Sequence, residues 1–186
     1  IATAELLGLE MLEILTIVSQ LESVNGRFEY IKSEDGITAI VDYAHTPDAL
    51  QNVLQTINNI RTNNEKLITV VGCGGDRDAL KRPKMAHIAA FLSNQVIFTS
   101  DNPRTEDPQH ILNDMEAGVC AEHYNKTLSI LDRKQAIKTA CKMASSGDII
   151  LIAGKGHESY QEVNGVRTHF NDLEEVTNCF NQLKKK

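Results

Sequence analysis

Charged side chains of both signs follow short apolar runs at several points of this sequence. After "QVIF" comes "TSDNPR", which carries Asp101, Asn102, Pro103 and Arg104. The guanidinium group of Arg104 suits a carboxylate, and the Asp101 carboxylate suits an ammonium group. Asn102 can donate or accept a hydrogen bond, and Pro103 stiffens the turn that presents Arg104. This combination predicts a clamp for a zwitterion such as the head group of an amino acid.

Three further polar segments extend this candidate site: "VDYAHTPD", "VVGCGGDRD" and "IAGKGHE". They add a second guanidinium group on Arg77 and a second carboxylate on Glu158. His45 is a candidate acid–base group, although a single loop histidine more often only forms a hydrogen bond. Pairing of all these charges with one another on the surface is the simpler alternative, and their spacing alone does not exclude it.

The elements that must position these side chains alternate between strands and helices. Apolar, partly β-branched strands are predicted at 66–72, 95–100, 127–131 and 148–154, with helices at 46–61, 80–94, 108–119, 132–145 and 172–183. Turn signals at "SEDG" and "NG" predict antiparallel hairpins over 27–43 and 159–170. The pattern indicates an α/β, Rossmann-like fold with a mostly parallel doubly wound sheet and flanking helices. Ligands bind beyond the carboxyl ends of such strands, where all four polar segments are expected.

Composition narrows the class of protein. The 186 residues fit one domain, with an amphipathic helix at 2–22 as helical material from a preceding unit. A net charge of −6 argues against nucleic-acid binding. The sequence contains no run of 18 apolar residues, so we predict no membrane span. No signal peptide is visible. The four cysteines form no CxxC pair and the histidines do not cluster, so we expect reduced thiols, a cytoplasmic protein and no metal site.

Two phosphate-binding motifs are matched only in part. In "GCGGDRD", Gly72 and Gly74 fit the first two positions of GxGxxG, but Arg77 occupies the third, where bulk disturbs helix packing. A dinucleotide-binding Rossmann-type oxidoreductase domain therefore remains as the alternative function. In "GKGHE", Lys155 is followed by Gly156 rather than by Ser or Thr, so this segment is not a P-loop. A non-enzymatic amino-acid-binding module is a third possibility.

Five motifs in order carry a resemblance to a known family: "GRFE", "VDYAHTPDAL", "GCGGDRD…KRPKM", "TSDNPRTEDP" and "AGKGHESYQ". Over residues 26 to about 172 they resemble the C-terminal part of the Mur ligases, and among these the members that add meso-diaminopimelate. The resemblance implies that residues 1–25 are the end of the central ATPase domain with its hinge. Residues 26–186 would form the C-terminal, amino-acid-binding domain.

The resemblance also implies a reaction and a set of site residues. ATP and Mg²⁺, held mainly by the central domain, would phosphorylate the glutamate carboxylate of UDP-N-acetylmuramoyl-L-alanyl-D-glutamate, and the diaminopimelate amine would attack the acyl phosphate. The expected diaminopimelate contacts are Arg77, Asp101, Asn102, Pro103, Arg104, Gly154 and Glu158. The expected nucleotide contacts are Arg27, Asp42 and, beside them, His45. No catalytic residue or metal ligand is expected in this chain, which alone should be inactive.

Overall fold

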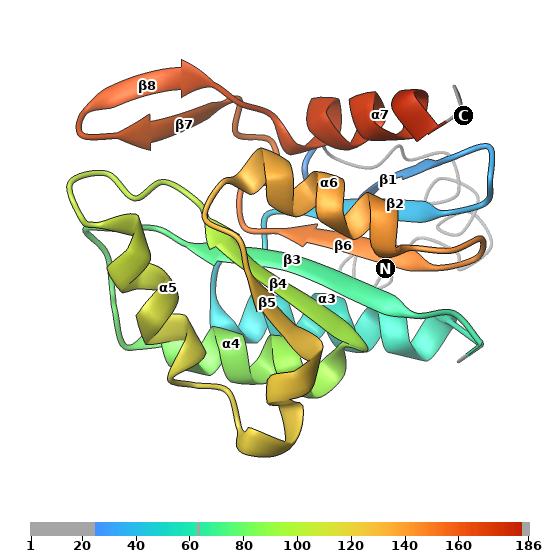
Figure 1. The fold of residues 1–186 in the computed structure, drawn as a ribbon, viewed down its shortest axis with the longest axis horizontal. Coiled ribbons are helices and arrows are strands. Elements are labelled where there is room, and N and C mark those ends of the chain that lie inside the picture. Colours follow the sequence, from blue (N-terminus) through green and yellow to red (C-terminus); the bar gives the residue numbers. More distant parts are fainter. Residues whose placement is uncertain (1–24, 63, 184–186) are drawn as a thin grey trace, which may run out of the picture.

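The computed structural model describes residues 25–62 and 64–183. Its main sheet has six strands in the order β1-β2-β6-β3-β4-β5, and β7 and β8 form a separate hairpin (Figure 1). The strands are β1 (Glu29–Lys32), β2 (Thr38–Asp42), β3 (Leu67–Cys73), β4 (Gln95–Ser100), β5 (Thr127–Ser129), β6 (Ile149–Ala153), β7 (Tyr160–Val163) and β8 (Val166–His169). The helix predicted at 2–22, and nearly all of the expected N-terminal remnant, lie outside the described residues.

The helices alternate with these strands as the sequence pattern predicts. They are α3 (Pro47–Ile60), α4 (Lys81–Leu92), α5 (Pro108–Glu116), α6 (Arg133–Met143) and α7 (Asp172–Leu183), with a short 3₁₀ helix, η1 (Ala121–Lys126), that was not predicted. Three helices begin at a side-chain cap. Thr46 Oγ1 accepts the Ala49 N–H, Asp107 accepts the Gln109 N–H, and Asp132 accepts the Gln135 N–H.

The sheet is parallel except at one edge. β2, β6, β3, β4 and β5 run in the same direction, and only β1 pairs antiparallel with β2. The predicted hairpins over 27–43 and 159–170 are both present. The second turns at Asn164 and Gly165, both with positive φ, as a tight hairpin requires. The predicted α/β architecture is confirmed.

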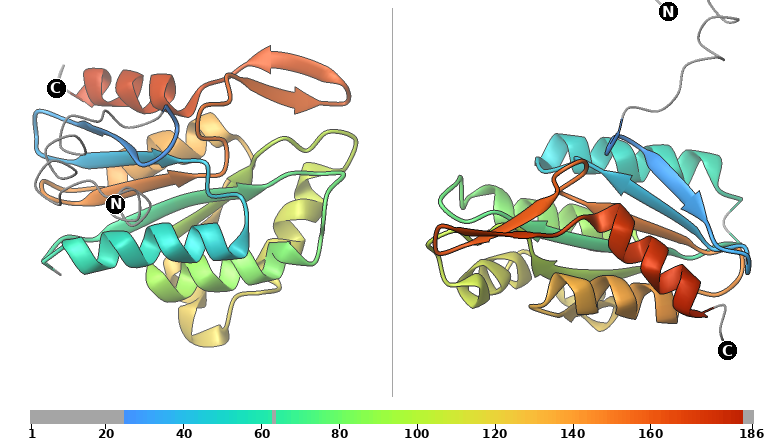
Figure 2. Two further views of the ribbon diagram at one scale, coloured as in Figure 1. Left: turned by 180° about the vertical axis from the view of Figure 1, so that it is seen from behind. Right: turned by 90° about the horizontal axis from the view of Figure 1, so that it is seen from above.

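Helices cover both faces of the sheet, with α3, α4 and α5 on one face and α6 and α7 on the other (Figures 1 and 2). The central strands must therefore be apolar on both sides. In β6, Leu151 and Ala153 face the first helical layer, whereas Ile150 and Ile152 face the second. This double burial explains why the strands read as continuous apolar runs. Within the described residues, no helix is long and apolar enough to cross a membrane.

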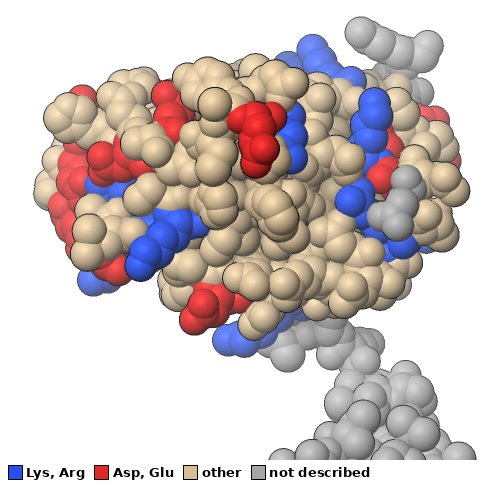
Figure 3. Space-filling view, turned by 90° about the horizontal axis from the view of Figure 1, so that it is seen from below, with Lys and Arg blue, Asp and Glu red and all other residues tan. Residues whose placement is uncertain are grey.

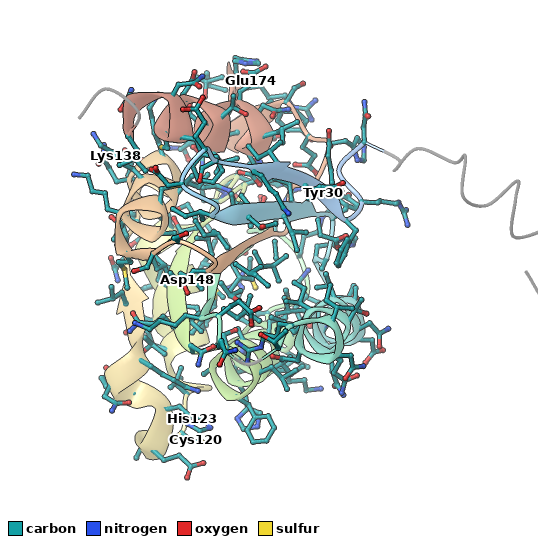
Figure 4. The ribbon with its side chains drawn as sticks, turned by 90° about the vertical axis from the view of Figure 1, so that its right-hand side faces the viewer. Tyr30, Cys120, His123, Lys138, Asp148 and Glu174 are labelled. Atoms are coloured by element: carbon teal, nitrogen blue, oxygen red, sulfur yellow. The ribbon has the colours of Figure 1, made fainter. Side chains whose placement is uncertain are left out.

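The amino ends of the strands carry polar residues with structural contacts. Asp148, labelled in Figure 4, is buried just before β6. Its carboxylate accepts the Lys66 N–H at 2.8 Å and the Ser145 N–H at 2.8 Å, so it ties the start of β3 to the turn after α6. Both carboxylate oxygens of Asp148 are thus used by backbone N–H groups. The polar residues that surround a cavity lie at the other end of the strands, the carboxyl end.

Candidate functional site

The strands β2, β3, β4 and β6 are parallel, so their carboxyl ends lie at the same end of the sheet. The segments that follow them surround a cavity of about 560 Å³. Seen from below in Figure 3, acidic and basic side chains lie side by side at this end of the molecule. The cavity is lined by Tyr43, His45 and Thr46 after β2; Gly74, Arg77, Asp78 and Lys81 after β3; Asp101, Asn102 and Arg104 after β4; and Gly154, Glu158 and Tyr160 after β6. The four polar segments thus share one site.

Six of the seven residues expected to bind the amino acid line this cavity, and Pro103 does not. Pro103 is buried on the far side of its loop, in a separate hollow that it shares with Pro108, Leu131 and Phe170. Its contribution to the cavity is through the backbone that it stiffens. A direct contact between Pro103 and the ligand stays a prediction.

Arg104 reaches the cavity from an unusual backbone conformation. Its φ is +53°, a left-handed value that is uncommon for a residue with a side chain. Its N–H donates to Glu162 O at 3.0 Å and its O accepts from Asn164 N at 2.6 Å, both in the β7–β8 hairpin. The guanidinium Nη1 donates to Gly75 O at 2.7 Å. One fork nitrogen is thus used to hold the loop, and the remaining donors are available to a ligand.

The β7–β8 hairpin also fixes the two residues before Pro103. Gln161 Nε2 donates to Asp101 O at 2.8 Å, and the Glu162 N–H donates to Asn102 Oδ1 at 3.0 Å. The "DNPR" loop is therefore held from outside by a hairpin about 60 positions later in the chain. The sequence predicts the hairpin but not this contact.

Lys155 is the main residue that the sequence reasoning missed. In the sequence it belongs to a segment that does not match a P-loop, yet its side chain is fully buried beneath the cavity. Its Nζ donates to Tyr160 O at 2.7 Å and Asn102 Oδ1 at 2.9 Å, and lies 3.3 Å from Glu158 Oε2 and 3.5 Å from Asp101 Oδ1. The two carboxylates expected to receive a ligand ammonium group therefore already share a cation. A lysine between two glycines at a strand end was the only sequence signal.

Gly154 serves the site by having no side chain. Its φ is +119°, and a Cβ atom there would lie 2.8 Å from Asp101 Oδ2. Any larger residue would be strained and would displace that carboxylate. Gly154 therefore leaves room for Asp101 at the cavity wall.

Arg77 lies on an exposed loop that is held by hydrogen bonds to the loop after β4. The carboxylate of its neighbour Asp76 accepts the Thr105 hydroxyl at 2.8 Å and the Thr105 N–H at 3.2 Å, and these bonds lower the pKa of Asp76. The buried Arg82 holds Glu106 with two bonds of 2.8 and 2.9 Å, which lowers the pKa of Glu106. The first contact connects the loop after β3 to the loop after β4, and the second connects helix α4 to the loop after β4.

The three residues expected to contact the nucleotide do not lie together. His45 lines the same cavity as the amino-acid residues, with Nδ1 2.9 Å from Tyr43 O. Asp42 and Arg27 do not line it. Asp42 Oδ2 accepts the Phe28 N–H at 2.8 Å, and burial raises the pKa of Asp42 against the lowering effects of that bond and of the Arg27 charge. Asp42 and the exposed Arg27 therefore form a separate group at the entry to the domain.

The charges and shape of the cavity define a class of ligand. Its lining includes two guanidinium groups, three carboxylates and the ammonium group of Lys81 around a space of small-molecule size. Asp78 and Lys81 are bonded to the backbone of Leu80 and His45, and the remaining charges suit a zwitterion that carries an additional carboxylate. Burial raises the pKa of the Tyr43 phenol, and the charges of Glu158 and Asp101 raise it further. Tyr43 therefore presents a neutral hydroxyl group to the cavity. The fold and the site are thus those of an α/β domain with a charged cavity of small-molecule size at the carboxyl ends of its strands.

Comparison with known proteins agrees with this class. Residues 26–156 match the family model described as the glutamate ligase domain of Mur ligases, and the chain belongs to that family. It is 58% identical over 178 residues to a UDP-N-acetylmuramoyl-L-alanyl-D-glutamate–2,6-diaminopimelate ligase of Bacteroides thetaiotaomicron, covering 96% of this chain and 37% of that protein. A ligase of the same name from Cytophaga hutchinsonii is 60% identical over 92% of this chain and 35% of that protein.

A solved structure with a similar fold carries the same ligase name as these relatives. This structure, described as a UDP-N-acetylmuramoyl-L-alanyl-D-glutamate–2,6-diaminopimelate ligase, superimposes with a TM-score of 0.79 and 44% identity, over 98% of this chain and 37% of that one. The chain thus spans a little over a third of the length of these relatives. Membership of the Mur ligase family disfavours the oxidoreductase alternative.

Proposed function

We propose that this chain is the C-terminal, amino-acid-binding domain of an ATP-dependent ligase of peptidoglycan biosynthesis in the bacterial cytoplasm. The ligase adds meso-diaminopimelate to UDP-N-acetylmuramoyl-L-alanyl-D-glutamate through an acyl phosphate. Residues 26–186 form the domain, and residues 1–25 are the end of the central ATPase domain with its hinge. The names of the relatives at 58% and 60% identity support the choice of substrate.

The observation that carries this proposal is the pairing of charges in the cavity. Meso-diaminopimelate differs from lysine by a carboxylate on its distal carbon. The cavity brings Arg77 and Arg104 together with Asp101 and Glu158, so a distal centre carrying both an ammonium group and a carboxylate meets both signs. A site built for lysine would need no guanidinium group at that position.

ATP supplies the phosphoryl group that activates the acceptor carboxylate. The sequence has no phosphate-binding loop of the GxxxxGK[ST] type, so we propose that ATP and Mg²⁺ are held mainly by segments that the longer relatives carry. Arg27 and Asp42, which lie together at the entry of the domain, and His45 suit a secondary role as contacts to the nucleotide. The residues of this domain bind and orient the amine for attack.

The test is the amino-acid dependence of the full-length ligase. We expect release of ADP that requires both the UDP-dipeptide and meso-diaminopimelate, with L-lysine a much weaker substrate. Equal turnover with L-lysine would contradict the proposed substrate. A melting-temperature increase with NAD but not with meso-diaminopimelate would instead favour the oxidoreductase alternative, and binding of the amino acid without any turnover would favour a non-enzymatic module.

A further inference from the structure

Lys155 has an environment unlike that of a surface lysine. Its side chain is fully buried, and its ammonium group is surrounded by oxygen atoms from two segments of the chain, 101–102 and 158–160. The contacts are Tyr160 O at 2.7 Å, Asn102 Oδ1 at 2.9 Å, Glu158 Oε2 at 3.3 Å and Asp101 Oδ1 at 3.5 Å. Burial of an ammonium group is costly unless its charge and its hydrogen bonds are satisfied. Here both conditions are met by residues that line the cavity.

These contacts determine which atoms face the ligand. Asn102 Oδ1 is held by Lys155 and by the Glu162 N–H, so the amide can turn only its Nδ2 toward Glu158, which it reaches at 2.8 Å. Glu158 Oε2 is therefore used by two donors. Among the described residues, no hydrogen bond reaches Glu158 Oε1 or Asp101 Oδ2. One oxygen of each carboxylate thus remains for a ligand in the cavity.

The charge count points to the same ligand group. Asp101 and Glu158 together carry two negative charges, and Lys155 cancels one of them. The nearby Arg133 does not alter this balance, because it is paired with the buried Asp172 at 2.7 Å. Taken by themselves, Lys155, Asp101 and Glu158 carry a single negative charge, which one ligand ammonium group neutralises. Two uncompensated carboxylates would repel each other and would have to be separated or neutralised.

We propose that Lys155 is a positioning residue that builds the ammonium subsite for the incoming amino acid. It aligns Asn102 and Glu158 and leaves one unit of negative charge for the substrate. This inference rests on the proposed function, since it assigns a role within the same cavity. It differs from a purely structural role for Lys155, in which loss of the side chain would destabilise the fold without selectively affecting the amino acid.

The experiment is steady-state kinetics of the full-length ligase with Lys155→Met, which keeps an unbranched side chain one atom shorter and removes its charge. We expect the KM for meso-diaminopimelate to rise at least about thirtyfold, as is typical when one partner of a buried charge pair is removed. The KM values for ATP and the UDP-dipeptide should change less than about twofold. An equal rise in all three KM values, or an unchanged KM for the amino acid, would overturn the proposal.

The matched control is Lys126→Met. Lys126 is half-buried, burial lowers its pKa, and its Nζ donates to Ser93 O at 2.9 Å. Ser93 lies just before β4, at the amino edge of the sheet and so opposite the cavity. Lys126 belongs to η1, which also contains His123, labelled in Figure 4. Loss of this lysine should reduce stability slightly and leave the KM for meso-diaminopimelate unchanged.

A second variant covers the case in which Lys155→Met does not fold. Lys155→Met/Glu158→Gln removes one charge of each sign and is compared with Glu158→Gln alone. If Lys155 acts through Glu158, the double variant should raise the KM for meso-diaminopimelate no more than about threefold beyond the single variant. A further rise of thirtyfold would mean that Lys155 acts elsewhere. Failure of the wild-type ligase to use meso-diaminopimelate would contradict the proposed function instead.

Discussion

At the scale of single residues, the cavity combines donors that are committed to the protein with donors that remain for a ligand. Arg104 illustrates both. Its backbone is held in a left-handed conformation by Glu162 and Asn164, and one guanidinium nitrogen donates to Gly75 O. The strain of this conformation is offset by contacts from the hairpin. A fixed arginine at this position reads a carboxylate more selectively than a mobile one.

We predict that Arg104→Ala in the full-length ligase selectively weakens use of meso-diaminopimelate. Loss of a partner from a desolvated charge pair costs about 2–5 kcal/mol, so the KM for meso-diaminopimelate should rise at least roughly thirtyfold. The weak use of L-lysine should change far less, because lysine has no distal carboxylate. Paired steady-state kinetics with both amino acids measure the difference. An equal loss with both would mean that Arg104 shapes the loop through Gly75 rather than reading the carboxylate.

At the scale of elements, one buried ion pair connects helices α6 and α7 to the strands that end at the site. Arg133, the first residue of α6, and Asp172, the first residue of α7, are both fully buried and form two bonds of 2.8 and 2.7 Å. Arg133 Nη2 also donates to Ala153 O at 3.1 Å, at the end of β6. These bonds fix the position of α6 and α7 relative to the carboxyl end of β6.

We predict that Asp172→Ala lowers the free energy of unfolding of the chain by about 3–5 kcal/mol, because it leaves the Arg133 charge buried without a partner. Glu175→Ala is the matched control, since it breaks a pair between the same two helices in which Lys134 is 60% exposed. That change should cost less than about 1 kcal/mol. Urea denaturation followed by circular dichroism measures both values. Similar losses in the two variants would show that the buried pair has no special weight.

At the scale of the whole molecule, the chain enters the domain against the loop that carries Lys155 and Glu158. Gly26 has a φ of +70°, and a Cβ atom there would lie 2.0 Å from His157 N. The entry segment is also held by the bond from Phe28 N–H to Asp42. Because Gly26 is in contact with the backbone of His157, a movement of the entry segment would displace the loop after β6. Such contact is suited to a domain that closes on a neighbour during catalysis.

We predict that Arg27→Ala impairs the full-length ligase but not the fold of this domain. The exposed guanidinium group has no packing role, so the free energy of unfolding of the chain should change by less than about 0.5 kcal/mol. Loss of a hydrogen bond to a charged nucleotide should lower kcat/KM for ATP at least about tenfold. Denaturation of the chain and kinetics of the ligase are the two measurements.

Asp42→Ala provides a contrast to this variant. It removes the acceptor of the Phe28 N–H, so we expect a loss of about 1 kcal/mol in the stability of the chain as well as impaired turnover of the ligase. This differs from Arg27→Ala, which should leave the stability of the chain almost unchanged. A large stability loss with Arg27→Ala would assign that residue a structural role instead.

The sequence by itself determined the architecture and most of the cavity wall. Runs such as "DIILIAG" are apolar at every position because their strands are covered on both faces, and this signal is local. The carboxyl ends of parallel strands necessarily meet, so the polar segments after β2, β3, β4 and β6 could be assigned to one site without coordinates. Four of the five family motifs include those segments, and the fifth, "GRFE", lies at the entry to β1.

Only the tertiary structure decided how the charges are distributed. Lys155 reads as an ordinary loop lysine, and its role depends on Asn102, which lies 53 positions earlier and approaches it only through the pairing of β3 with β4 and β6. The position of Pro103 in a second hollow beside Leu131 and Phe170, and the hydrogen bonds between the β7–β8 hairpin and Arg104, likewise depend on contacts between distant segments. Residue types and spacing describe what each segment can offer. Which of those groups remains available to a ligand depends on which partners the fold has already brought to it.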